Sequence, residues 1–288
     1  MPRTNSDRLV KMAVAGEVSA PTVPPTRYRV GAGGRPFVPI GMAGVVYNVK
    51  VGDRAFGWAG DHVEPGVSIH HPEPWADYAM HYLACVGNSA RVTSGDAQGA
   101  PGVVTGEHAR LLIDFPDDVL DRLCVGDQIQ IEAIGAGLAL PDYPHITARK
   151  LDPDLLDRLN LREAPGGVLQ AGVTLMLPSY AMASAWELGP EYVDHDITTN
   201  DREMVRELGI DRLRIGDLVA VTDTDHSWGR GYRKGAVMIG LINHADSPQI
   251  GHGPGCMTLL SCADGRLQPF LDPDANVANF LGCGRARD

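Results

Sequence analysis

Six side chains able to bind a metal ion or to transfer protons lie close together within residues 216–255. They are Asp223, Asp225, His226, His244, Asp246 and His252. The first three follow an apolar run at residues 218–221, and the next two follow a second apolar run at residues 236–242. His252 lies among glycines. Carboxylate and imidazole groups without thiolates suit Mn²⁺, Zn²⁺ or Fe²⁺. The segment therefore predicts a divalent metal site, and a hydrogen-bonded histidine–aspartate network beneath a loop is the alternative.

Within this segment we expect Asp225, His226 and His244 to be metal ligands, because they stand at strand ends, where a rigid frame positions loops. Asp223 is expected to have a catalytic role. Asp223 and His252 are also replacement ligands, and His252 is otherwise expected to contact the substrate. No spacing here matches a defined zinc motif such as His-Glu-x-x-His.

A second cluster lies in the first half of the chain, at residues 57–71. Asp61, His62 and Glu64 fall within four positions between two glycines. We expect Asp61 and His62 to be metal ligands and Glu64 to be the general base. The alternative is a turn in which Asp61 caps backbone groups and His62 packs over Trp58.

Two further stretches carry similar side chains. In residues 94–108, a binding role for Asp96 and His108 is as well supported as a purely structural turn. In residues 192–201, Asp194, His195 and Asp196 precede a helix, and part of this group is expected to cap it. We rank that group below residues 216–255.

Cationic side chains after the central aspartates offer contacts for an anion. Arg230, Arg233 or Lys234 could anchor a substrate carboxylate or stabilise an oxyanion. We assign Arg230 to catalysis, and Arg233 to substrate binding together with Asp96 and His252. A serine nucleophile is not indicated, because there is no Gly-x-Ser-x-Gly elbow.

The elements that must position these groups are mainly strands and turns. The chain has 34 glycines and 21 prolines, and few runs have helical period. A Gly-Asp pair precedes a strand or turn in residues 51–53, 125–127 and 215–217. Glycine takes positive φ in such a turn, and the aspartate ties down backbone N–H groups. These aspartates are therefore expected to be structural.

The expected fold is mainly β with a few helices (α+β), with barrel- or sandwich-like β units in two halves and the site between them. Helices are predicted over residues 116–123, 152–161 and 201–208, and residues 178–188 could form a fourth. A seam between the halves is expected at residues 163–167 or slightly before.

Three segments are expected along the chain. Residues 1–27 form an N-terminal arm, residues 28–150 an N-terminal β-rich domain, and residues 151–288 a C-terminal α+β domain. We expect the loops of residues 57–71 and 223–252 to converge on one cleft, because neither alone offers a full set of ligands and a base. Glu64 and His226 would then lie within about 12 Å of each other.

Composition limits the possible partners. The net charge of −11 argues against a nucleic-acid partner, which usually needs a basic face. No stretch is long enough to span a membrane. Five scattered cysteines without Cys-x-x-Cys spacing suggest reduced thiols and a cytoplasmic protein. The expected partners are a small-molecule substrate and further copies of the chain in a homo-oligomer, with neither nucleic acid nor membrane.

Four stretches together resemble the domain-of-unknown-function 4438 family, from about residue 38 to residue 282. They are GWAGDHVEPGVSI, SGDAQGAPGVVTGEH, DHDITTND and DHSWGRGYRKGAVMIGLINHADSPQIGHGPG. The chain also resembles metal-dependent hydrolases of small amides and lactams, namely the acetamidase/formamidase group and the manganese-dependent enzymes that open lysine and ornithine lactams. That second resemblance implies a metallo-amidohydrolase with Mn²⁺ or Zn²⁺.

The leading hypothesis is therefore metal-dependent hydrolysis of a small cyclic amide. A metal-dependent lyase or isomerase of a small hydroxy or keto acid needs the same Lewis acid and base, and it stays open. A non-enzymatic small-molecule-binding protein with structural histidines is the third hypothesis.

Overall fold

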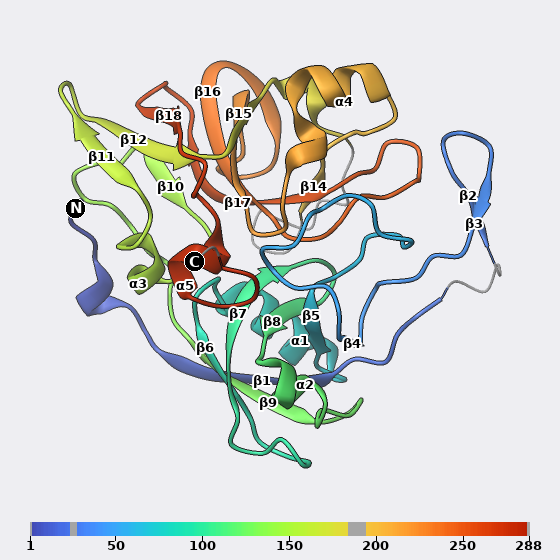
Figure 1. Ribbon diagram of the computed structural model, residues 1–288. Coiled ribbons are helices and arrows are strands. Elements are labelled where there is room, and N and C mark those ends of the chain that lie inside the picture. The colour runs from blue at the N-terminus through green and yellow to red at the C-terminus, as the bar shows by residue number, and fades with distance from the viewer. Residues whose placement is uncertain (1, 24–27, 184–193, 287–288) are drawn as a thin grey trace.

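The computed structural model describes residues 2–23, 28–183 and 194–286. The chain forms two β-rich units that share an interface, the first in the lower half of Figure 1 and the second in the upper half. This arrangement confirms the expected mainly β fold with a few helices. Across the described residues, no helix is both long and apolar enough to cross a membrane.

The first unit is a closed antiparallel barrel. Its strands are β1 (Met12–Val18), β9 (Gln128–Ala133), β6 (Ser89–Val92), β7 (Pro101–Glu107), β8 (Leu111–Asp114) and β5 (Gly66–His70), in this order around the barrel. Pairing of β1 with β5 closes the ring, and β4 (Val45–Val46) extends it from β5. In β9, buried and exposed residues alternate, so Ile129 and Ile131 fill the interior.

The first residues of the chain are part of this barrel. Met12–Val18 falls within the segment predicted to be an arm, but it forms β1 and pairs with β9 on one side and β5 on the other. The prediction of an arm over this stretch is therefore wrong. Met12 and Val14 alternate only with alanines, and Gly16 interrupts the pattern, so the alternation is too weak to identify a strand.

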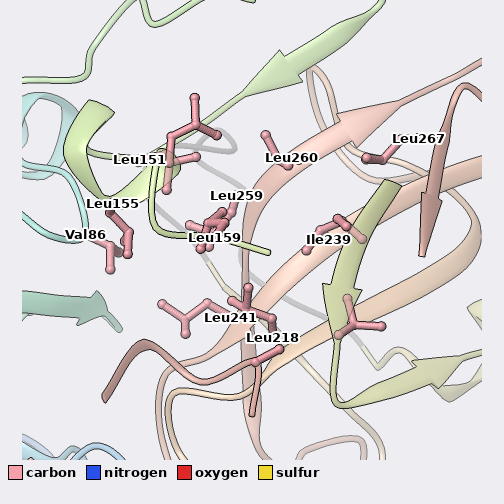
Figure 2. Packing of buried hydrophobic residues seen from close by; sticks show 14 of the residues in the cluster. Val86, Leu151, Leu155, Leu159, Leu218, Ile239, Leu241, Leu259, Leu260 and Leu267 are labelled. Atoms are coloured by element: carbon pink, nitrogen blue, oxygen red, sulfur yellow. The ribbon is translucent and has the colours of Figure 1, made fainter. Parts of the chain in front are cut away.

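The second unit is built on a mixed sheet. Its order is β10 (Ile146–Ala148), β17 (Gly255–Cys262), β16 (Gly231–Ile242), β15 (Leu218–Asp225) and β13 (Leu175–Leu177), and β14 (His195–Asp196) also pairs with β17. Every residue of β17 is buried, because apolar side chains cover both faces of the sheet. Figure 2 shows part of one of these layers, a cluster that contains Leu241, Leu259 and Leu260 of the sheet together with Leu155 and Val86.

Smaller elements complete the fold. A three-stranded sheet contains β11 (Leu161–Ala164), β12 (Val168–Val173) and β18 (Leu267–Leu271), and β2 (Arg29–Val30) pairs with β3 (Pro36–Phe37) in a hairpin that projects from the body in Figure 1. Short 3-10 helices are η1 (Ser6–Arg8), η2 (Ser179–Ala181) and η3 (Ile210–Arg212). The seam expected at residues 163–167 is the turn of the β11–β12 hairpin.

The helices are few and short. They are α1 (Pro74–Leu83), α2 (Asp117–Leu120), α3 (Pro153–Leu156), α4 (Arg202–Leu208) and α5 (Val277–Leu281). The predicted α4 is confirmed: the Asp201 side chain accepts hydrogen bonds from the N–H groups of Glu203 and Met204 at its start. α2 and α3 are shorter than predicted, and α1 and α5 were not predicted. Of the helix suggested at 178–188, only η2 is seen, and residues 184–188 lie outside the described residues.

The three Gly-Asp turns share one geometry. The glycines Gly52, Gly126 and Gly216 have φ values of 95°, 91° and 93°. In each turn the aspartate accepts a hydrogen bond from the N–H three residues earlier, at 2.9 Å for Asp53 and 2.8 Å for both Asp127 and Asp217. The predicted structural role of these aspartates is confirmed.

Candidate metal centre

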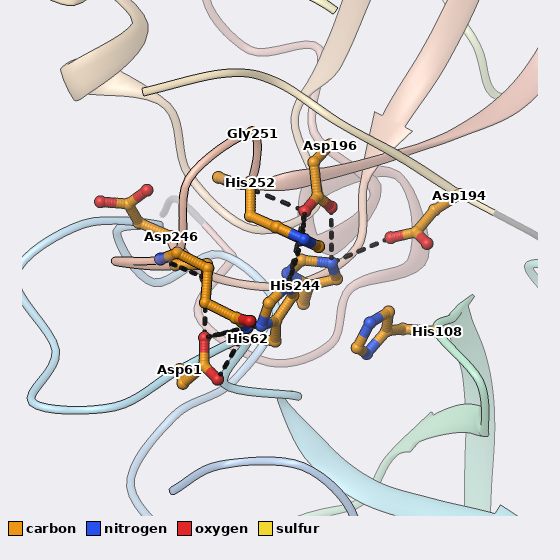
Figure 3. A network of polar contacts seen from close by, with 12 residues as sticks. Asp61, His62, His108, Asp194, Asp196, His244, Asp246, Gly251 and His252 are labelled. Carbon is orange, nitrogen blue, oxygen red and sulfur yellow. Dashed lines mark hydrogen bonds and ion pairs between the residues drawn. The ribbon is translucent and has the colours of Figure 1, made fainter. Parts of the chain in front are cut away.

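A cluster of histidines and aspartates lies where the two units meet (Figure 3). The barrel side contributes Asp61, His62 and Glu64 from the loop before β5, and His108 after β7. The second unit contributes Asp194 and Asp196 at β14, His244 after β16, and His252 before β17. The loops are joined by backbone hydrogen bonds, since Ala245 donates its N–H to the carbonyl of Val63. The predicted convergence of residues 57–71 with the later loop is confirmed for residues 244–252.

Three of the imidazoles are held through Nδ1. Nδ1 of His62 lies 2.7 Å from Oδ1 of Asp61, and Nδ1 of His108 lies 2.8 Å from Oε1 of Glu64. Nδ1 of His244 lies 2.8 Å from the backbone carbonyl of the next residue. Each oxygen is an acceptor, so it selects the tautomer with the proton on Nδ1 and leaves the lone pair on Nε2. Metal-binding histidines are oriented in this way.

The remaining ligand atoms converge in three overlapping groups, each with all its atoms within 4.8 Å of one another. The groups are His62, His108 and His244; His62, Asp196 and His252; and Asp194, Asp196 and His244. Nε2 of His244 lies 2.9 Å from Oδ2 of Asp194 and 3.4 Å from Oδ1 of Asp196. Oδ2 of Asp196 lies 2.6 Å from Nδ1 of His252 and 3.4 Å from Nε2 of His62.

Two buried atoms of this cluster make no hydrogen bond to any residue that the structure describes. Nε2 of His244 lies close to both carboxylates but forms a hydrogen bond with neither, and Oδ1 of Asn243 has no hydrogen-bond partner. The amide of Asn243 is oriented by its Nδ2, which donates to Oδ2 of Asp194 at 2.9 Å. Because buried polar atoms are nearly always satisfied, these two require an explanation. A cation bound between them and Asp194 would satisfy both.

The short strand β14 separates two kinds of side chain. It pairs with β17 so that His195 faces Cys256 and Asp196 faces Gly255. Successive residues of a strand point to opposite faces. Asp194 and Asp196 therefore point toward His244, whereas Nε2 of His195 lies 3.1 Å from Nε2 of His226.

The backbone near the centre is constrained at two positions. His62 has a φ of 51°, a left-handed conformation that is rare for a non-glycine residue and concentrates at functional sites. A Cβ atom on Gly255 would lie 2.0 Å from Oδ2 of Asp194, and 2.3 Å from both Oδ1 of Asn243 and Nε2 of His244. Only glycine at position 255 leaves room for these atoms to converge.

Opposite charges set the ionisation of the cluster. Burial alone would lower the pKa of His244, but its contacts with Asp194 and Asp196 raise that pKa well above the ordinary histidine value. Burial would raise the pKa of Asp196, whereas contacts with His244, His252 and His62 hold that pKa well below its usual range. The carboxylates are therefore ionised, and a metal ion competes with protons for the imidazoles.

Comparisons with known proteins identify the family. The family model described as domain of unknown function (DUF4438), N-terminal, matches residues 28–157, and its C-terminal counterpart matches residues 158–281. The chain belongs to the DUF4438 family. A solved structure described as "Crystal structure of TM1086" is similar to it at 39% sequence identity, with a TM-score of 0.91, covering 97% of this chain and 99% of that chain. None of the curated proteins matches.

In this family member, the predicted residues Asp61, His62, Glu64, His244 and His252 come together. Asp61 and Glu64 lie behind the imidazoles, because each carboxylate accepts from an Nδ1. Glu64 also accepts hydrogen bonds from the N–H of Ala43 and the hydroxyl of Ser68.

The structure does not bring Asp225 and His226 to this cluster. His226 follows the end of β15 and His244 follows the end of β16, and these two strands form an antiparallel hairpin in which Asp225 pairs with Gly231. His226 therefore lies at the turn end of the hairpin and His244 at its open end. Both histidines follow a strand in the sequence, but the two strand ends are far apart along the ladder. Nδ1 of His226 lies 2.5 Å from the hydroxyl of Thr258.

The other residues near Asp225 have local contacts. Asp225 accepts hydrogen bonds from the N–H and hydroxyl of Ser227. Oδ1 of Asp223 accepts the N–H of Gly235 at 2.7 Å and closes the β-bulge at this point in β15. Arg233 lies 3.8 Å from Asp225 on the surface.

The remaining predicted groups are also placed elsewhere. Arg230 donates to the backbone carbonyl of Ala183 and lies near the His195–His226 pair. Burial lowers the pKa values of both histidines, and the charge of Arg230 adds to that effect. Asp96 lies in a barrel loop where its carbonyl accepts from Arg122. Asp246 accepts from the hydroxyl of Thr199 at 2.8 Å.

Asp194, Asp196 and His108 were ranked too low from the sequence. The Asp-x-Asp spacing of residues 194–196 was a usable signal, because a two-residue period on a strand places both carboxylates on one face. His108 directly follows the end of β7 at Glu107.

Proposed function

We propose that this protein is a metal-dependent hydrolase of a small amide, with a cyclic amide as the substrate class. The observation that carries the proposal is the convergence of His62, His108 and His244, each held through Nδ1 by an oxygen, beside the buried carboxylates of Asp194 and Asp196. The choice of a cyclic amide rests on the resemblance to lactam hydrolases.

The donor set suits Zn²⁺ or Mn²⁺. Imidazole nitrogens and carboxylate oxygens bind both ions, and the cluster contains no thiolate. A divalent ion bound there would lower the pKa of a water molecule and polarise a substrate carbonyl. His62, His108, His244, His252, Asp194 and Asp196 are the residues that would hold it.

The carboxylates behind the histidines act as positioning groups in this proposal. Asp61 holds His62, and Glu64 holds His108. The general-base role of Glu64 stays a prediction, and its three hydrogen bonds favour the positioning role.

The free state of all five cysteines suits the reducing cytoplasm that we expect for the protein.

The proposal is tested by removing and restoring the metal. The purified protein is treated with a chelator, reloaded with Zn²⁺ or Mn²⁺, and assayed on a panel of five- to seven-membered lactams, including amino-lactams. We expect ring opening that is lost on chelation and restored by metal, with a product heavier by one water. A protein that holds no divalent ion after dialysis against either metal, or a turnover unaffected by chelation, would contradict it.

The same assay separates the other two hypotheses. A product of unchanged mass from a hydroxy or keto acid would identify an isomerase, and loss of water from such a substrate would identify a lyase. Metal binding without turnover of any amide would favour a binding protein.

A further inference from the structure

We infer that this centre takes two divalent ions rather than one, bridged by the carboxylate of Asp196. The inference rests on the proposed function in that it requires a metal at this cluster. It adds the number of ions, the partition of the ligands between them and the residue that links them.

The ligand atoms divide into two groups around the two oxygens of Asp196 (Figure 3). The first group is Oδ1 of Asp196 with Nε2 of His244, 3.4 Å apart, and Oδ2 of Asp194, 2.9 Å from that nitrogen. The second group is Oδ2 of Asp196 with Nδ1 of His252 at 2.6 Å and Nε2 of His62 at 3.4 Å, and the two ring nitrogens lie 3.1 Å apart.

These separations are those of neighbouring ligands on one ion. Zinc–nitrogen and zinc–oxygen bonds of about 2.0–2.2 Å place adjacent ligand atoms about 3.0–3.5 Å apart in octahedral or tetrahedral geometry. The distances between ligand atoms within the two groups fall near this range, except for the shorter distance between His252 and Asp196. Two ions bridged in this manner lie about 3.5–4 Å apart in known two-metal sites.

The contacts of Asp196 favour two ions over one. An imidazole nitrogen has a single lone pair, and the two oxygens of Asp196 face different histidines. His108 belongs with the first group, because its ring centroid lies 4.1 Å from that of His244 and 5.4 Å from that of His62.

Ordinary hydrogen bonding does not explain the first group. Nε2 of His244 is fully buried beside two carboxylates and bonds to neither. Oδ1 of Asn243 is a second buried acceptor without a hydrogen-bond partner in the described part of the chain. Both atoms lie 2.3 Å from the position that a Cβ on Gly255 would take. These two buried atoms and the carboxylate of Asp194 surround one point, and a cation bound there in place of a proton on His244 would satisfy all three.

The two positions differ in their access to solvent. The side chain of His252 is 37% exposed, whereas those of His244 and Asp194 are 0% and 10% exposed. We therefore expect the ion at His62 and His252 to exchange faster and to bind more weakly than the ion at His244 and Asp194.

The experiment is a count of bound ions on the full-length protein. Metal-free protein is titrated with Zn²⁺ by calorimetry, its metal content after dialysis is measured by mass spectrometry, and Mn²⁺-loaded protein is examined by electron paramagnetic resonance for a spin-coupled pair. His252→Ala removes a ligand of the second ion alone. His71→Ala, on a partly exposed residue outside the cluster, is the matched control.

We expect two ions per chain with a coupled Mn²⁺ signal in the wild type and in His71→Ala, and one ion with an uncoupled signal in His252→Ala. One ion per wild-type chain at saturation, with an uncoupled signal, would overturn the two-ion inference and leave the proposed hydrolase intact. No bound ion would overturn the metal centre itself. Because the wild-type count decides the question alone, the inference stays testable if a variant does not fold.

Discussion

Oδ1 of Asp61 lies 2.7 Å from Nδ1 of His62, the next residue in the chain. The hydroxyl of Ser247 donates to the same oxygen at 2.7 Å, and the amide of Gln249 donates to the other oxygen at 3.2 Å. Burial would raise the pKa of Asp61, but these bonds, led by that of His62, lower it. Asp61 is thus an ionised support for His62 instead of the ligand that the sequence suggested.

This support can be tested with Asp61→Asn. The amide keeps the size of the side chain but loses its charge, so His62 becomes a weaker and less ordered ligand. We expect metal affinity to fall about 10- to 100-fold. Asp225→Asn is the matched control and should leave metal affinity unchanged, because among the described residues Asp225 bonds to its own hairpin and to Ser261 and not to the cluster. If metal affinity fell with Asp225→Asn and not with Asp61→Asn, the assignment of Asp61 as the support of a metal ligand would be wrong.

Glu64→Gln separates two roles for Glu64. If Glu64 positions His108, the substitution weakens metal binding about 10- to 100-fold, and turnover at saturating metal recovers in large part. If Glu64 is the general base, metal affinity stays unchanged and kcat falls at every metal concentration, by about 100-fold or more. We expect the first pattern. Metal titration followed by assays at saturating metal distinguishes them.

Gly255→Ala should abolish binding of the ion nearest His244. The new Cβ would lie 2.0 Å from Oδ2 of Asp194 and 2.3 Å from Nε2 of His244, so these atoms must move apart. We expect a destabilisation of about 1–3 kcal/mol as well, which is typical of overpacking. Gly231→Ala is the control, because a Cβ there meets no atom within 4 Å and its φ is not positive. The metal content of both variants measures the loss of the ion, and urea unfolding measures the destabilisation.

The buried pair of His195 and His226 should make the protein sensitive to mild acid. Burial, followed by the charges of His195 and Arg230, lowers the pKa of His226 to about 3. Between pH 6.5 and 3 the unfolded chain therefore binds a proton at this histidine and the native state does not. The free energy of unfolding falls as pH falls.

From pH 7.5 to 6.0, this loss amounts to about 0.8 kcal/mol for one such histidine. We expect His226→Gln to reduce the pH dependence by about that amount in metal-loaded protein. Urea unfolding at the two pH values measures it, and equal slopes for wild type and variant would show that His226 does not titrate as described.

The features predicted well from the sequence are local ones. A Gly-Asp turn and the cap at Asp201 depend on a few adjacent residues, so the pattern alone determines them. The cluster at Asp61 and His62 was recognisable for the same reason, since its groups are neighbours in the chain.

The features that were missed depend on pairing between distant segments. Five residues between the ends of β15 and β16 imply a hairpin, which places His226 and His244 at opposite ends, but the apolar runs alone do not show this. Asp194 and Asp196 are brought to His244 only because β14 adds to β17. Sequence alone does not reveal that partner, because a two-residue strand has too little pattern to set its register.

The most direct test of the metal centre is anomalous diffraction from crystals grown with Zn²⁺ or Mn²⁺. Data collected on either side of the metal absorption edge locate the ions without reference to the protein atoms. We predict anomalous density among His62, His108, His244, His252, Asp194 and Asp196, within about 2.0–2.2 Å of their nitrogen and oxygen atoms. Density at Asp225 and His226 instead, or none between these histidines at saturating metal, would contradict the account.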